Sequence, residues 1–135
     1  MPGSIVLNRT TSLRTDSTYF DADCDASLSI GNVVHFSDST LYYVEEQVDN
    51  MHINPAIGIA IRKLTTTRVR VQTFGPCRLT FPSITQANKR LFVDIDGTLT
   101  TTPPAIGYVQ TFGHCHYTNK IFIDPSITRV KRIPF

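Results

Sequence analysis

Apolar residues along this chain fall in short runs, and several runs alternate with polar residues at the two-residue period of a β-strand. The clearest case is the segment 68–74, in which valines alternate with arginines and a glutamine. Periodicity of the helical kind is weak throughout, so the pattern predicts an all-β chain. The predicted strands are 33–36, 41–44, 57–62, 68–74, 78–81, 91–93, 106–112, 120–123 and 128–133.

One segment occurs twice. Residues 33–41 are similar to residues 91–99, and each copy is followed by the tetrapeptide Pro-Ala-Ile-Gly, at 55–58 and at 104–107. Each copy predicts an apolar strand, a tight turn of the type Asp-x-Thr and a returning strand. The chain is therefore expected to contain two related strand-turn-strand repeats.

The domain organisation follows from the position of these repeats. We predict a single β domain over residues 31–135, with internal repeats at about 31–74 and 90–124. Residues 1–30 are rich in Thr, Ser and Asp with only short apolar pieces, which is typical of an arm or of short strands with turns. We assign them as an N-terminal arm.

The second copy contains a sequence that resembles a catalytic motif. Residues 92–100, Phe-Val-Asp-Ile-Asp-Gly-Thr-Leu-Thr, resemble the first signature of the haloacid-dehalogenase-like phosphatases. That resemblance implies Asp94 as nucleophile and Asp96 as acid/base, with a magnesium ion beside them. It also implies later metal-binding acids, yet Asp124 is the sole acidic residue after Thr100. The first copy has Phe36 at the position of Asp94.

A hairpin turn explains the same residues without any catalytic role. Glycine after aspartate supplies the positive φ that a tight turn needs. We therefore interpret residues 94–97 as a turn, expect no enzymatic activity and no cofactor, and keep the phosphatase as the less favoured alternative.

Cysteine and histidine residues offer a second candidate for chemistry. The three cysteines, Cys24, Cys77 and Cys115, are odd in number and widely spaced, so they do not predict a disulfide framework. In a strand, His114 and His116 share one face while Cys115 points to the other, so the three cannot bind one metal ion together. We predict a core cysteine, outward histidines and no metal site.

Charge is distributed unevenly. Residues 1–55 hold two arginines against eight acidic residues, a net charge of −6, whereas residues 56–135 hold eleven basic residues against three acids, a net charge of +8. This separation of charge along the chain suits docking of one subunit on the next, or pairing of the two halves inside one fold. The basic residues alternate with Val and Ile and lack a nucleic-acid-binding signature, so no direct nucleic-acid contact is expected.

Composition fits a structural module. Charged residues make up 18% of the chain and Trp is absent, while Thr and Ser are abundant, which favours sheet over helix. No apolar stretch approaches the roughly 20 residues that span a membrane. The first residues lack the basic and apolar regions of a signal peptide, so assembly in a cytoplasm is expected.

With these residues in view, a family can be named. A strand, the Asp-Gly-Thr-Leu turn at 96–99 and the return strand Ala-Ile-Gly-Tyr-Val at 105–109, repeated in a small Thr-rich chain, resemble bacteriophage virion proteins, especially small capsid decoration or cement proteins. The resemblance implies a β-barrel or tulip-like sandwich with an N-terminal arm, forming homotrimers that bind the major capsid protein in the virion. Similar barrels serve as adaptors on tails, baseplates and fibres.

Two sets of residues are candidates for partner binding. A sugar-binding or host-binding site is the rival to shell binding, and tyrosines 42, 43, 108 and 117 are its candidates. For the virion partner we expect contacts from both the arm and the hairpin at 57–74. The candidate partner-binding residues are Arg9, Arg14, Asp21, Asp23, Asp25, Arg68 and Arg70.

Overall fold

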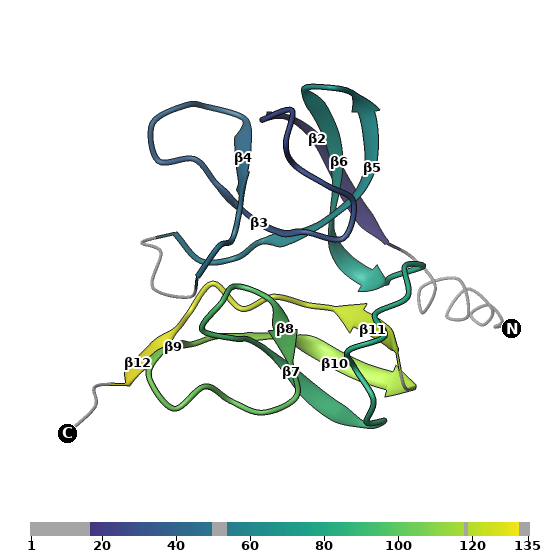
Figure 1. The fold of residues 1–135 in the computed structure, drawn as a ribbon, viewed down its shortest axis with the longest axis vertical. Helices are drawn as coiled ribbons and strands as arrows, with labels where there is room; N and C mark the ends of the chain where they lie inside the picture. The colour runs from purple at the N-terminus through teal and green to yellow at the C-terminus, as the bar shows by residue number, and fades with distance from the viewer. Residues whose placement is uncertain (1–16, 50–53, 118, 133–135) are drawn as a thin grey trace, which may run out of the picture.

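The computed structural model describes residues 17–49, 54–117 and 119–132, and these residues form strands, turns and loops without a helix. Figure 1 shows two lobes, with β2 to β6 in the upper one and β7 to β12 in the lower one. The fold is all-β, as the sequence predicts. The strands are β2 (Thr18–Cys24), β3 (Val33–Phe36), β4 (Tyr43–Glu46), β5 (Gly58–Thr65), β6 (Arg68–Pro76), β7 (Lys89–Val93), β8 (Leu99–Thr100), β9 (Gly107–Val109), β10 (Thr111–Tyr117), β11 (Lys120–Ile123) and β12 (Val130–Arg132).

The upper lobe is a small closed barrel. Its strands follow the order β2-β4-β3-β5-β6, and an antiparallel pairing between β2 and β6 closes the ring. The β2–β4 pair is parallel and short, while the other neighbouring pairs are antiparallel. A small barrel is thus confirmed, and closure removes the open edges of its strands.

The duplicated sequence corresponds to a duplicated topology. In the first unit the order is β4-β3-β5-β6, and in the second unit the order β8-β7-β10-β11 repeats it. Strand β6 then pairs with β11 in antiparallel fashion, so one nine-stranded sheet runs through both units. The two units thus share one strand order, and the first is closed into a barrel by β2. A separate two-stranded ribbon of β9 and β12 completes the second unit.

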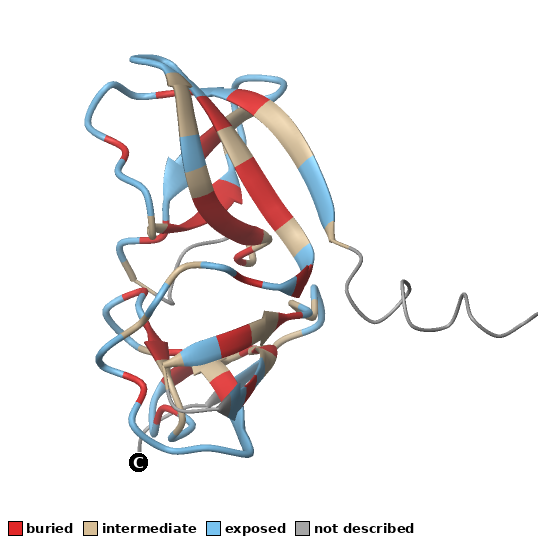
Figure 2. Ribbon diagram, turned by 90° about the vertical axis from the view of Figure 1, so that its right-hand side faces the viewer, coloured by how far each residue is buried: buried red, intermediate tan, exposed pale blue. Residues whose placement is uncertain are grey.

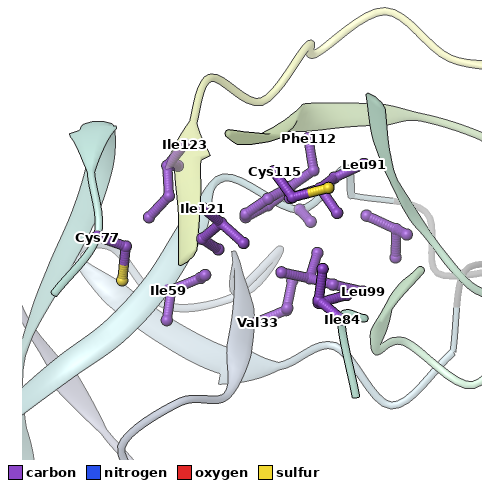
Figure 3. Packing of buried hydrophobic residues seen from close by; sticks show 12 residues of the cluster. Val33, Ile59, Cys77, Ile84, Leu91, Leu99, Phe112, Cys115, Ile121 and Ile123 are labelled. Carbon is purple, nitrogen blue, oxygen red and sulfur yellow. The ribbon is translucent and has the colours of Figure 1, made fainter. Parts of the chain in front are cut away.

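Two strands of the first unit are buried on both faces. In β3 and β5, Val34 and Ala60 point into the barrel, whereas Val33 and Ile59 belong to a second core that the two units share. Figure 3 shows Val33 and Ile59 facing side chains of the second unit, and Figure 2 shows how buried positions recur along the strands of both lobes. The shared core unites the two repeats into one packed body. Its buried members are Val33, Ala56, Ile59, Cys77, Ile84, Leu91, Val93, Leu99, Phe112, Cys115, Ile121 and Ile123.

The assignment of residues 1–30 to an arm is wrong for the part that the structure describes. Residues 18–24 form β2, which pairs with β6 along its length, and Ala22 and Cys24 are buried inside the barrel. The sequence Thr-Tyr-Phe-Asp-Ala-Asp-Cys alternates, but its apolar members are small or aromatic, so the alternation is faint. Residues 1–16 lie outside the described residues.

Several other predicted strands also differ from the observed ones. Residues 78–81 form no strand, although the amide of Phe81 donates a hydrogen bond to the carbonyl of Asn119. Gly75-Pro76 does not end β6, because these two residues carry it onto β11. The predicted strand 106–112 divides at Gln110, whose buried side chain binds the backbone of Ala56.

The turn after β7 packs directly on the first unit. Gly97 has a φ of +86°, and a Cβ atom there would overlap the carbonyl oxygen of Gln47. Within the turn, the Asp96 carboxylate accepts hydrogen bonds from the amide and hydroxyl groups of Thr98. The Asp-Gly pair is thus required by backbone conformation and by close approach between the two units.

We predict that Gly97→Ala lowers the free energy of unfolding by about 3 kcal/mol or more, because the substitution adds both strain and overlap. Gly31→Ala is the matched control. Gly31 also has a positive φ, of +97°, but open space surrounds its Cβ position. The control should lose only about 1 kcal/mol in urea unfolding, and equal losses in the two variants would contradict the packing argument.

Candidate functional site

The outer face of the second unit carries a row of side chains in register across three strands. Arg90 on β7 lies opposite His114 on β10, and His114 lies opposite Phe122 on β11. Opposed residues of an antiparallel pair project from the same face, so the three side chains adjoin. The rings of His114 and Phe122 stack at 5.2 Å with an interplanar angle of 16°, and Phe74 meets Phe122 edge-on at 5.2 Å.

Two adjoining hollows lie along this row and share His114 and Phe122. One, of about 570 Å³, is polar, and the other, of about 550 Å³, is mainly apolar. We call the two hollows together the β10–β11 groove. The polar hollow is lined by Asn88, Lys89, Arg90, Thr111, Gly113, His114, Phe122 and Asp124, and the apolar one by Pro76, Cys77, His114, His116, Lys120, Ile121 and Phe122.

The groove is predominantly cationic. Lys89, Arg90 and Lys120 are exposed around it, against a single carboxylate, that of Asp124. At the floor of the apolar hollow, burial raises the pKa of the Cys77 thiol, which favours the uncharged form. The combination of cations, stacked rings and an apolar hollow suits an anionic partner that also presents an apolar or aromatic group.

Cys115 and its neighbouring histidines lie as the sequence predicts. Cys115 is buried and its thiol donates to the carbonyl of Gln86 at 2.7 Å, while His114 and His116 are exposed on the opposite face. Figure 3 shows Cys115 beside Leu91 and Phe112. Among the described residues, no group of three or more His, Cys, Asp or Glu side chains is placed to hold a metal ion.

Four of the residues predicted to bind a partner instead pair with one another. Arg70 donates two hydrogen bonds to Asp21, at 2.8 and 3.2 Å, and Arg68 donates one to Asp23 at 2.9 Å. The hydrogen bond from Arg70 lowers the pKa of Asp21, and the same contact raises the pKa of Arg70. These charges fasten β2 to β6, so the acidic and basic halves meet within one molecule at this point.

Of the other three predicted partner-binding residues, Arg9 and Arg14 lie outside the described residues. Asp25 is exposed and lies beside Tyr43, Glu45 and Glu46 in a small hollow of about 200 Å³ at the barrel.

The phosphatase-like sequence lies in an antiparallel hairpin of β7 and β8. The Asp94 carboxylate accepts a hydrogen bond from the amide of Ile95, and Asp96 binds Thr98, a contact that lowers the pKa of Asp96. Both carboxylates thus hold the turn. The parallel α/β core that the phosphatase resemblance implies has no counterpart in the described residues.

The tyrosines proposed for a sugar site are divided between the two units. Tyr42 and Tyr43 belong to the β3–β4 hairpin, whereas Tyr108 lies on β9 with the guanidinium of Arg129 4.0 Å from its ring centre. The side chain of Tyr117 is outside the description. The tyrosines that the structure describes therefore do not gather in one place.

Sequence reasoning missed the β10–β11 groove. The period-two pattern does place His114, His116 and Phe122 on an outer face, and this signal was available. The cross-strand register that brings Arg90 beside His114 was not available, because it depends on a pairing between strands 20 residues apart and on the irregularity between Thr111 and Gly113.

Comparison of the chain with protein families, with curated proteins and with solved structures finds no match. Within the described residues, no helix is long and apolar enough to cross a membrane. The function must therefore be argued from the residues and their geometry.

For the β2–β6 ion pair, we expect Asp21→Asn to lower the melting temperature at neutral pH. Because Arg70 lowers the pKa of folded Asp21 below its ordinary 3.8, the carboxylate stabilises the fold above that value, and this contribution is lost as the pH falls through the folded pKa. The gap between wild type and variant should close in strong acid. Asp23→Asn, at the more exposed pair, should have the smaller effect, and a pH-independent gap would argue against the ion pair.

For the turn, we expect Asp94→Asn to leave the fold and its thermal stability nearly unchanged, since asparagine keeps an oxygen that can accept the Ile95 amide. Asp96→Ala, which loses both Thr98 contacts, should be the less stable variant by about 1 kcal/mol. Circular dichroism on heating measures both. Magnesium-dependent hydrolysis of a generic phosphate ester by the wild type, abolished in Asp94→Asn, would restore the enzymatic alternative.

Proposed function

We propose that this chain is a non-enzymatic structural protein of a bacteriophage virion, a capsid decoration protein that binds and stabilises the head shell. Its partner would be the major capsid protein, and copies of the chain would act together as a homo-oligomer, a trimer in the simplest case. It would act in the virion after assembly in the host cytoplasm. The family resemblance of the repeated hairpins and the arrangement of the two units support this proposal.

The observation that carries the proposal is the continuous sheet through both units. Strand β6 belongs to the barrel and also pairs with β11, and a shared apolar core fills the space between the lobes. A body built in this way keeps its two ends at a fixed separation. Fixed separation is useful to a protein that must contact neighbouring subunits of a shell simultaneously, because weak contacts then add up through avidity.

Apolar groups on both units also support a binding role. At the barrel tip, Leu41 is 79% exposed and Tyr42 is 69% exposed, while Phe122 of the second unit lines the β10–β11 groove and meets Phe74 of β6 edge-on. Large apolar side chains next to charged ones are typical of protein contact surfaces.

Several polar groups that could in other settings perform chemistry are engaged in holding the fold. Asp96 binds the turn, Asp21 binds Arg70, and the buried ring of His35 contacts the side chains of Gln47 and Glu45 at 2.8 and 3.2 Å. Their geometry favours a role in shape over a role in catalysis. An adaptor of the tail, baseplate or fibre would use the same surfaces, and location within the particle separates it from a decoration protein.

The test is the location of the chain in purified particles. We expect many copies per particle on the head shell, and we expect particles stripped of the chain to release their genome at a lower temperature, with readdition restoring the original temperature. The Gly31→Ala variant serves as a folded control for readdition. Recovery of the chain with tails alone would favour the adaptor, and its absence from every particle would overturn the proposal.

A further inference from the structure

Cations and apolar groups line the β10–β11 groove, and their chemistry specifies the kind of surface that would bind there. Exposed cations at Lys89, Arg90 and Lys120 surround the stacked rings of His114 and Phe122 and an apolar hollow. A complementary surface must therefore present acidic groups around an exposed apolar or aromatic tip.

Such a surface exists at the other end of the same chain. The β3–β4 hairpin and the residues after it, 36–49, expose Leu41, Tyr42 and Val48, whose exposed fractions are 79%, 69% and 61%. The acids of this segment are Asp38, Glu45, Glu46 and Asp49. We call this segment the acidic hairpin.

The tip of the acidic hairpin is held in an unusual conformation. Tyr42 has a φ of +57°, a left-handed value that is rare for a bulky side chain. The carbonyl of Tyr42 accepts a hydrogen bond from the amide of Asp23 at 3.0 Å, and the Ser37 amide donates to the carbonyl of Tyr43 at 2.8 Å. The barrel therefore fixes the backbone of a strongly exposed aromatic residue, as is common where backbone strain serves recognition.

The overall charge of each end agrees with this complementarity. Residues 17–49 and 54–76 carry seven acidic and four basic residues, whereas residues 77–117 and 119–132 carry three acidic and seven basic residues. Two of the barrel acids already pair with Arg68 and Arg70. In the acidic hairpin, Glu45 also contacts His35 at 3.2 Å, whereas Asp38 and Glu46 are exposed to solvent.

Dimensions match as well. From Arg90 to Phe122 the row crosses two strand spacings, about 10 Å, and the four residues of β4, from Tyr43 to Glu46, also extend about 10 Å. With the tip over His114 and Phe122, Glu46 can therefore approach Arg90. In Figure 1, β4 lies at the upper left and β10 and β11 lie at the lower right, in the other lobe, so the acidic hairpin and the groove belong to different units of one molecule.

We propose that the β10–β11 groove binds the acidic hairpin of a second copy of this chain, with Leu41 and Tyr42 over His114 and Phe122. The contact is head-to-tail, and such a contact closes into a ring when the rotation permits and otherwise continues as a filament. This inference rests on the proposed function and deepens it by naming the contact between copies. The contact between copies is tested on the free chain, whereas the proposed function is tested on purified particles. Failure of one proposal can therefore be distinguished from failure of the other.

The experiment is sedimentation of the full chain over a range of concentrations at low and high salt. The wild type should self-associate, and association should weaken as salt shortens the Debye length to below about 8 Å. Reversal of the groove cations, Arg90→Glu with Lys120→Glu, should weaken association by about tenfold or more, and so should Asp38→Lys with Glu46→Lys. Circular dichroism checks that each variant is folded.

A mixture of the two double variants provides the decisive measurement. The groove variant keeps an unmodified hairpin, and the hairpin variant keeps an unmodified groove. The mixture should therefore form a complex at close to wild-type affinity, whereas each variant alone should associate more weakly. The matched control is Arg62→Glu with Arg78→Glu, which changes the charge equally at exposed residues outside the groove. This control should associate like the wild type, and weakening equal to that of the groove variant would overturn the proposal.

Replacement of the tip tests the apolar part of the contact. Leu41→Ser with Tyr42→Ser leaves every charge in place and should also weaken association. A wild-type chain that is monomeric at every soluble concentration would overturn the proposal. So would a monomeric chain that binds a labelled single-stranded oligonucleotide through Arg90 and Lys120, because the groove would then be assigned to nucleic acid.

Discussion

The whole structure depends on the burial of β3 and β5 from both sides. Because side chains alternate along a strand, Val34 and Ala60 can fill the barrel while Val33 and Ile59 fill the core shared with the second unit. Burying a side chain such as Ile59 contributes about 1.5–3 kcal/mol. Where both faces are buried the strands must be apolar on both, which is why Val33-Val34 and residues 57–61 form short apolar runs rather than alternating patterns.

Buried amides fix the register of the segments around this core. Gln110 donates to the carbonyls of Ala56 and Ser126, both at 2.7 Å, and accepts the amide of Ala56 at 3.1 Å. Gln72 similarly donates to the carbonyls of Phe74 and Pro76 within β6. Leaving such groups unsatisfied in a buried setting would cost about 1–3 kcal/mol each, so only one alignment of these loops satisfies them. Both glutamines begin a Gln-Thr-Phe-Gly segment, at 72–75 and at 110–113, but Gln72 binds the backbone of its own strand, whereas Gln110 binds two distant segments.

The sequence predicted the repeated hairpins, the outward histidines and the buried Cys115, because each depends on local alternation and turn chemistry. It did not predict β2 as a barrel strand, since the role of residues 18–24 is set by closure against β6, which is 44 or more residues away along the chain. The same limit applies to the ion pairs of Asp21 and Asp23. Their partners, Arg70 and Arg68, become visible only once the strand register is known. The β10–β11 groove was missed for the same reason.

Closure of the barrel also restricts how copies of this protein can join. Among the described residues, β2 pairs with both β4 and β6, so the nine-stranded sheet ends at β8, which is two residues long. So short an edge offers little backbone for an added strand. Growth by strand addition at this end of the sheet, the route to cross-β aggregates, is thereby disfavoured. Side chains on the outer faces can instead make contacts between copies, and each such contact can form, exchange and be tuned by substitution without any change in the sheet itself.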